Sequence, residues 1–110
     1  MPASVVNLTI EKGTDFEASF YVTGDDGDML NLLYTTASAK IKKHPTSKKS
    51  TEFVCGLTTS LGEIKVSMAR TTTTELTSGR NYFDVFIQNS EFDFVSRVVT
   101  GTIIVEDTNL

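Results

Sequence analysis

Hydrophobic and polar residues alternate along most of this chain with a period of two. The clearest example is residues 81–87, where Phe83 and every second residue after it are apolar, while Asp84 points to the opposite side. Such alternation is typical of a β-strand with one face buried and the other in water. Turn formers occupy residues 88–91, and a second run rich in β-branched residues then fills residues 92–105. These two segments are predicted to form the central hairpin of the domain.

Earlier parts of the chain carry the same pattern. Alternation predicts further strands at residues 5–11, 16–22, 37–42, 52–57 and 62–68. The spacing of Thr72 and Glu75 matches a capping box, which predicts one helical turn before Leu76. Seven or eight short strands separated by turn signals indicate an all-β fold, an immunoglobulin-like antiparallel β-sandwich with at most one short helical turn. A small antiparallel barrel is the alternative.

The inward positions of these strands define a predicted core. Its members are Leu8, Ile10, Phe16, Phe20, Ile41, Val54, Ile64, Val66, Phe83, Val85, Ile87, Val98, Ile103 and Val105. Gly101 interrupts the last apolar run, which indicates a β-bulge or the close approach of another backbone. A length of 110 residues suits one domain, so we predict a single domain over residues 1–110 with flexible polar tails at 1–4 and 107–110.

Charge and cysteine content narrow the class of protein. Fourteen acidic and ten basic residues give a formal net charge of −4, which disfavours nucleic acid or an anionic membrane as the partner. Cys55 is the single cysteine, so an intramolecular disulfide is excluded and a buried structural thiol is expected. The first residues lack the pattern of a signal peptide, and no apolar run approaches the roughly 20 residues of a membrane span.

Catalytic patterns are missing from the sequence. It contains no nucleophile with an adjacent base, no phosphate-binding loop and no metal-ligand set. We therefore expect no enzymatic activity, no cofactor and no small-molecule substrate. The acidic segment Asp25–Asp28 is read as a hairpin turn, with a weak ion site as the alternative. A calcium loop needs a glutamate about twelve positions from its start, and nothing acidic occurs in residues 29–51.

Half of the basic residues are concentrated between positions 40 and 49. They are Lys40, Lys42, Lys43, Lys48 and Lys49. No aromatic residue lies nearby to stack on bases, which disfavours nucleic acid. Two interpretations stay open: a solvated edge kept soluble by lysine, or a contact surface for an acidic patch on a neighbouring protein. In the second case these five lysines are the partner-binding residues.

Several motifs, taken in order, carry a resemblance to a known family. They are IEKGTDF at 10–16, a GDDG turn at 24–27, GEIKVSM at 62–68, LTSGRNYFDV at 76–85 and RVVTGTIIV at 97–105. Together they resemble the small immunoglobulin-like domains of tailed bacteriophage virions, in particular the N-terminal domain of baseplate upper proteins. This chain departs from that pattern by one extra residue between Gly79 and Tyr82, and no second domain is expected after Val105.

The resemblance implies a non-enzymatic virion structural protein, made in the host cytoplasm. It would be an assembly module of the tail, baseplate or neck, present in multiple symmetric copies and bound to other virion structural proteins. A capsid (head) decoration protein and a carbohydrate-binding or adhesion module are the alternatives.

The resemblance also assigns structural roles to five residues. Gly13 and Gly79 form turns, and Tyr82 acts as a tyrosine corner that bonds the upstream backbone. Asp84 is expected to accept a hydrogen bond from Arg97 or from the backbone.

Overall fold

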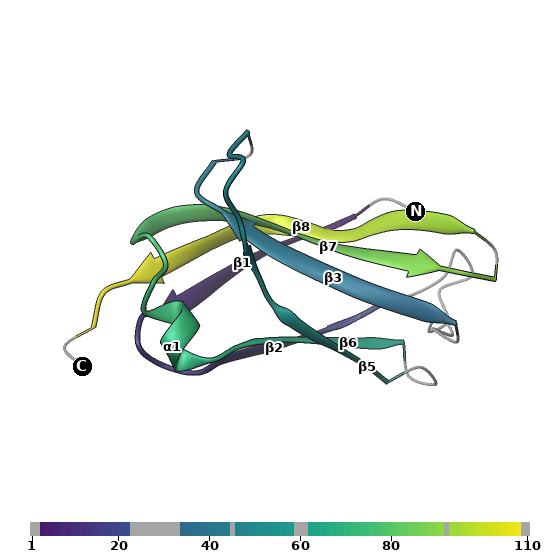
Figure 1. The fold of residues 1–110 in the computed structure, drawn as a ribbon, viewed down its shortest axis with the longest axis horizontal. Helices are drawn as coiled ribbons and strands as arrows, with labels where there is room; N and C mark the ends of the chain where they lie inside the picture. Colours follow the sequence, from purple (N-terminus) through teal and green to yellow (C-terminus); the bar gives the residue numbers. More distant parts are fainter. Residues whose placement is uncertain (1–2, 23–33, 45, 59–61, 92, 109–110) are drawn as a thin grey trace.

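Two β-sheets packed face to face make up the protein (Figure 1). The structure, a computed structural model, describes residues 3–22, 34–44, 46–58, 62–91 and 93–108. These residues form eight strands and one short helix, which confirms the predicted all-β sandwich. The acidic turn Asp25–Asp28 lies outside the described residues, so its interpretation as an ion site stays a prediction.

The strand order is that of an immunoglobulin-type sandwich. One sheet runs β1 (Ser4–Glu11), β8 (Phe94–Glu106), β7 (Gly79–Asn89), β3 (Thr35–Lys42), β4 (Thr51–Glu52). The other runs β2 (Phe16–Tyr21), β6 (Glu63–Met68), β5 (Val54–Thr58). In an immunoglobulin constant domain the corresponding strands divide between the sheets in the same way, except that the first strand joins the sheet of β2. Here β1 joins the sheet of β8 instead.

The pairing of β1 departs from the fully antiparallel sandwich that was predicted. β1 lies parallel to β8, from Ser4 opposite Val99 to Glu11 opposite Glu106. The other strand pairs of the described residues are antiparallel. A parallel pair needs a long connection, and the whole intervening chain supplies it, because the turn at Gly13 sends the chain into the opposite sheet.

This parallel pair depends on the absence of a side chain at Gly101. A Cβ atom built there would lie 1.7 Å from the carbonyl oxygen of Val6 on β1. The close backbone approach expected at this glycine is therefore present. The register shift of the β7–β8 hairpin lies elsewhere, between Val85 and Phe86, and it leaves both Val98 and Val99 buried.

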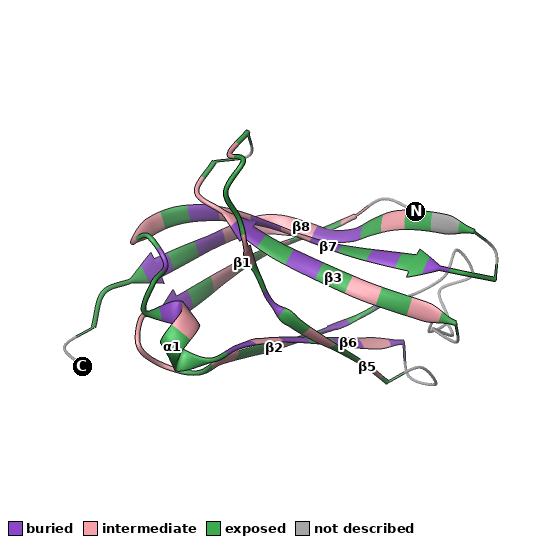
Figure 2. Ribbon diagram, in the orientation of Figure 1, coloured by how far each residue is buried: buried purple, intermediate pink, exposed green. Residues whose placement is uncertain are grey.

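Buried and exposed residues alternate along the strands, as Figure 2 shows. Eleven of the fourteen predicted core residues are buried, and Leu8 and Phe16 are half-buried against them. The prediction for Val54 is wrong, because its side chain is 69% exposed. The core also contains residues that were not predicted, namely Val22, Ala39, Phe53, Met68, Leu76 and Val99.

Val54 faces outward because burial alternates along residues 51–58, with Phe53, Cys55 and Leu57 on the inner side. Phe53 lies between β4 of one sheet and β5 of the other, and its N–H donates to the carbonyl of Ala39 at 3.0 Å. This places the Phe53 ring in the core, 5.9 Å between centroids from the ring of Phe16. Strand alternation then directs Val54 to solvent.

The helical turn α1 (Arg70–Thr73) holds the β1–β2 turn in place. It begins at Arg70 rather than after Thr72, and its first N–H donates to the carboxylate of Asp15 at 2.9 Å. Thr73, the last residue of α1, is fully buried. Its hydroxyl donates to the carbonyl of Thr14 at 2.8 Å and accepts from the N–H of Gly13 at 3.2 Å.

Thr73→Val is expected to lower the free energy of unfolding by about 1–3 kcal/mol. Valine keeps the shape of threonine but leaves the part-buried N–H of Gly13 and carbonyl of Thr14 without their partner. Thr74→Val is the matched control, because the exposed Thr74 hydroxyl bonds only the carbonyl of Arg70 in its own helix, at 2.8 Å. Urea denaturation measures both, and equal losses would show that the link to the turn contributes nothing.

Residues placed in the predicted tails belong partly to the folded domain. Ser4 is the first residue of β1. The carboxylate of Asp107 accepts a 2.6 Å hydrogen bond from Ser78 and lies 3.7 Å from the Lys12 ammonium. The hydroxyl of Thr108 donates to the carbonyl of Lys12 at 2.6 Å. The chain therefore stays bound to the domain beyond the end of β8.

Candidate functional site

The structure separates the five lysines of the basic segment. Lys40 and Lys42 lie on β3 and share the outer face of the five-stranded sheet, which is the face turned away from the core. Lys48 and Lys49 are exposed in the loop that precedes β4. The five do not all share one surface, although Lys42, Lys43 and Lys49 line a second depression together.

Lys43 has an internal structural role. Its ammonium donates to the backbone carbonyls of Ser78 and Arg80, at 3.1 Å each. These carbonyls flank Gly79, which has a φ of 103° and so adopts a conformation that other residues rarely reach. Lys43 thus braces the turn that begins β7, and Gly79 occupies the turn position that the resemblance gave it.

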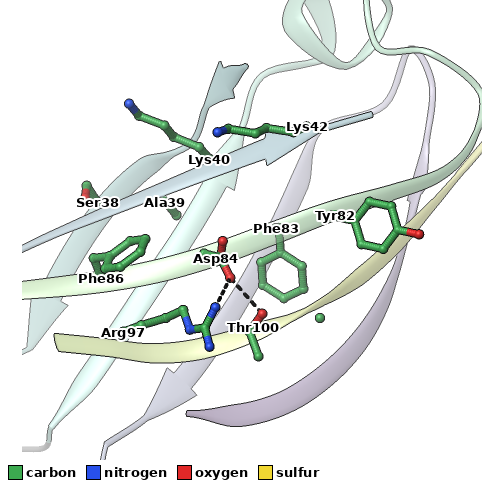
Figure 3. Close-up of a pocket in the computed structure, with 11 residues that line it drawn as sticks. Ser38, Ala39, Lys40, Lys42, Tyr82, Phe83, Asp84, Phe86, Arg97 and Thr100 are labelled. Atoms are coloured by element: carbon green, nitrogen blue, oxygen red, sulfur yellow. Dashed lines mark hydrogen bonds and ion pairs between the residues drawn. The ribbon is translucent and has the colours of Figure 1, made fainter. Parts of the chain in front are cut away.

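A shallow pocket lies on the outer face of the five-stranded sheet (Figure 3). Its volume is about 530 Å³, and β3, β7 and β8 supply its walls. Its charged and aromatic lining residues are Lys40, Lys42, Tyr82, Phe83, Asp84, Phe86 and Arg97. Sequence analysis singled out all of these residues except Phe86, but it expected a contact only between Asp84 and Arg97.

Asp84 lies at the centre of this pocket. In the sheet it is directly opposite Lys40 on β3 and Thr100 on β8. Its carboxylate accepts a 2.7 Å hydrogen bond from the Thr100 hydroxyl and lies 3.6 Å from Nη1 of Arg97. The expected contact with Arg97 is present as an ion pair, and the contact with Thr100 was not foreseen.

The bond to the upstream backbone that was expected from Tyr82 is made by Asn81 instead. Asn81 is buried, and its amide donates to the carbonyls of Thr77 and Gly79 at 2.9 and 3.0 Å. Tyr82 faces outward into the pocket. Burial alternates along β7, so the side chain of Asn81 faces the core and that of Tyr82 faces outward.

Large apolar side chains surround the pocket on the same face. They are Val5 of β1, Phe86 of β7, and Val95 and Ile104 of β8, with exposed fractions of 75, 39, 64 and 38%. Exposed large apolar side chains gathered on one face are a feature of surfaces that bind other proteins.

Two titratable side chains outside the pocket, those of Cys55 and Tyr21, have raised pKa values. Burial raises the pKa of the Cys55 thiol, which keeps it protonated and a poor nucleophile. The hydroxyl of Tyr21 donates to Glu63 at 2.9 Å, and this bond raises the pKa of Tyr21.

In the part of the chain that the structure describes, no group of three or more histidine, cysteine or acidic residues is placed to hold a metal ion. None of the described helices is long and apolar enough to cross a membrane.

Comparison with known proteins gives a likeness of fold. No family model and no curated protein matches the chain. Among solved structures, 53 chains match, including the N-terminal domain of phage TP901-1 ORF48. That domain is 14% identical, with a TM-score of 0.60, and the match covers 96% of this chain and 90% of that one. The chain thus shares its fold with a domain of a phage protein.

Proposed function

We propose that the chain is a non-enzymatic structural protein of a bacteriophage virion. It acts as an assembly module of the tail, baseplate or neck, present in multiple copies and bound to other virion proteins. The observation that carries the proposal is the fold match to a phage protein domain over almost the full length of both chains. The ordered motifs of the sequence point to the same class of protein.

The edges and faces of the sandwich suit assembly. β1 and β4 end one sheet, and β2 and β5 end the other, so the described strands leave backbone groups at the sheet edges that a neighbouring chain can pair. The outer face of the five-stranded sheet adds exposed apolar and charged side chains. Charge pairing across such a surface mainly sets orientation and the rate of association.

Quantitative mass spectrometry of purified phage particles tests the proposal. An amber mutation in the gene, suppressed or not, provides particles made with and without the protein. We expect the suppressed particles to contain the chain in several copies at a fixed ratio to a major tail protein, and the unsuppressed ones to be defective in assembly. A protein abundant in the lysate but missing from purified particles would contradict the proposal.

Mass spectrometry of partly assembled particles distinguishes a location in the tail from one in the head. Phage blocked in head formation accumulate free tails, and phage blocked in tail formation accumulate free heads. We expect the chain to purify with the tails. Recovery with the heads alone would favour the capsid decoration alternative.

A further inference from the structure

Positive charge is concentrated in the pocket on the outer face of the five-stranded sheet. Three cationic side chains line it, from Lys40, Lys42 and Arg97, against one carboxylate, from Asp84. The pocket therefore carries a local excess of two positive charges on a chain whose formal net charge is −4. A depression lined mainly by one sign of charge attracts groups of the opposite sign.

Asp84 forms no ion pair with Lys40 or Lys42. Its carboxylate contacts two side chains of β8 instead. The Thr100 hydroxyl bonds its carboxylate at 2.7 Å, and Arg97 lies 3.6 Å away on the same side (Figure 3). Lys40, opposite Asp84 in the sheet, instead lies 3.8 Å from Glu52, and both of these side chains are more than half exposed. Among the described residues, no carboxylate lies within ion-pair distance of Lys42.

The Lys40–Glu52 pair is therefore easily replaced. An exposed ion pair of this length contributes little to stability. A carboxylate arriving from another protein can take the place of Glu52 and also meet Lys42, so it gains a second cation that Glu52 does not use.

Apolar surface adjoins the charged centre. Tyr82 and Phe86 lie two residues before and after Asp84 on β7, so their side chains flank it on the same face. Val5, Val95 and Ile104 extend this surface over β1 and β8. A partner that fits both parts presents an acidic residue beside apolar ones.

We propose that this pocket binds an acidic, apolar-flanked segment of a neighbouring virion protein, with a carboxylate of that segment placed between Lys40 and Lys42. The inference rests on the virion function proposed above and names the chemistry of the partner. Of the five lysines of the basic segment, only Lys40 and Lys42 are proposed to contact the partner. Lys43 is engaged with the backbone, and Lys48 and Lys49 lie off the sheet.

Two matched charge reversals test the inference in the phage. The amber mutant is complemented with the wild type, with Lys40→Glu/Lys42→Glu, or with Lys48→Glu/Lys49→Glu. Both double variants change the net charge equally, so a general charge effect would act on both. We expect the pocket variant to be incorporated into particles at least about tenfold less than the wild type, because it places like charges against the partner. The loop variant is expected to be incorporated like the wild type.

Folding is checked on the purified variants by circular dichroism and thermal unfolding. Lys40→Gln/Lys42→Gln provides a second variant, without added negative charge, that should be incorporated to an intermediate degree. Equal incorporation of the folded pocket and loop variants would overturn the inference and leave the virion function standing. Absence of the wild type from particles would instead remove the virion function itself.

Carbodiimide cross-linking of wild-type particles gives an independent readout, because it joins lysine amines only to carboxylates in contact with them. Mass spectrometry is expected to find Lys40 or Lys42 joined to an aspartate or glutamate of another virion protein. That acidic residue should lie beside apolar residues in its own sequence. Recovery of Lys40 joined only to Glu52, in particles that contain the chain, would count against the inference.

Discussion

Phe83→Ala is expected to lower the free energy of unfolding by about 3–5 kcal/mol. The Phe83 side chain is 3% exposed, and its ring stacks on that of Phe20 with 6.2 Å between centroids. Phe83 belongs to β7 and Phe20 to β2, so the contact joins the two sheets. Alanine would leave a cavity between two rigid layers that cannot close over it.

Phe86→Ala is the matched control for this prediction. It removes the same ring from the same strand, but Phe86 faces outward and is 39% exposed. We expect a loss of no more than about 1 kcal/mol, in the range of surface substitutions. Urea denaturation of both variants gives the comparison, and similar losses would refute the assignment of the inner face of β7.

Gly101→Ala is expected to destabilise the protein by about 3 kcal/mol or more. The added Cβ would lie 1.7 Å from the carbonyl oxygen and 2.8 Å from the carbonyl carbon of Val6. Both clashing atoms are backbone, so no side-chain rotation relieves them, and overpacking of this kind is costly. β1 must move away from β8 and give up hydrogen bonds.

Hydrogen exchange separates this local effect from general destabilisation. Amides of β1 are expected to lose protection most, while those of β6 keep theirs until global unfolding. Gly56→Ala, in β5, is the control, because a Cβ there meets nothing within 4 Å. It should change stability by no more than about 0.5 kcal/mol. Unchanged protection of β1 in Gly101→Ala would contradict the close approach.

Local alternation predicted the strands and most of the core because each strand has one buried face. It failed at Val54 because the wrong set of alternate residues was taken as inward: Phe53, Cys55 and Leu57 face the core, and this alternation continues unchanged as the chain passes from one sheet to the other. It also gave no sign that β1 is parallel to β8, since that pairing joins residues 95 positions apart. Gly101 was the one local sign of this contact. It indicated that another backbone approaches closely, but not which strand supplies it.

The candidate site was less accessible to sequence reasoning. Composition identified a basic segment, but the pocket is made by cross-strand neighbours such as Lys40, Asp84 and Thr100, whose register only the folded sheet defines. Lys43 looked like its neighbours in the sequence, yet its partners are carbonyls 35 and 37 residues away. A side chain's partners across a sheet leave no local pattern.

The parallel pairing of β1 with β8 has a mechanical consequence. Because both strands point the same way, tension applied along the chain from before β1 and after β8 pulls them in opposite directions along their length. All of the hydrogen bonds between them then bear the load together, instead of opening one after another from an end. Forced unfolding depends on the rate of crossing that barrier rather than on equilibrium stability. We therefore expect the domain to resist stretching better than its modest size suggests. That resistance depends on Gly101, because only a residue without a side chain lets β1 approach β8 closely at Val6.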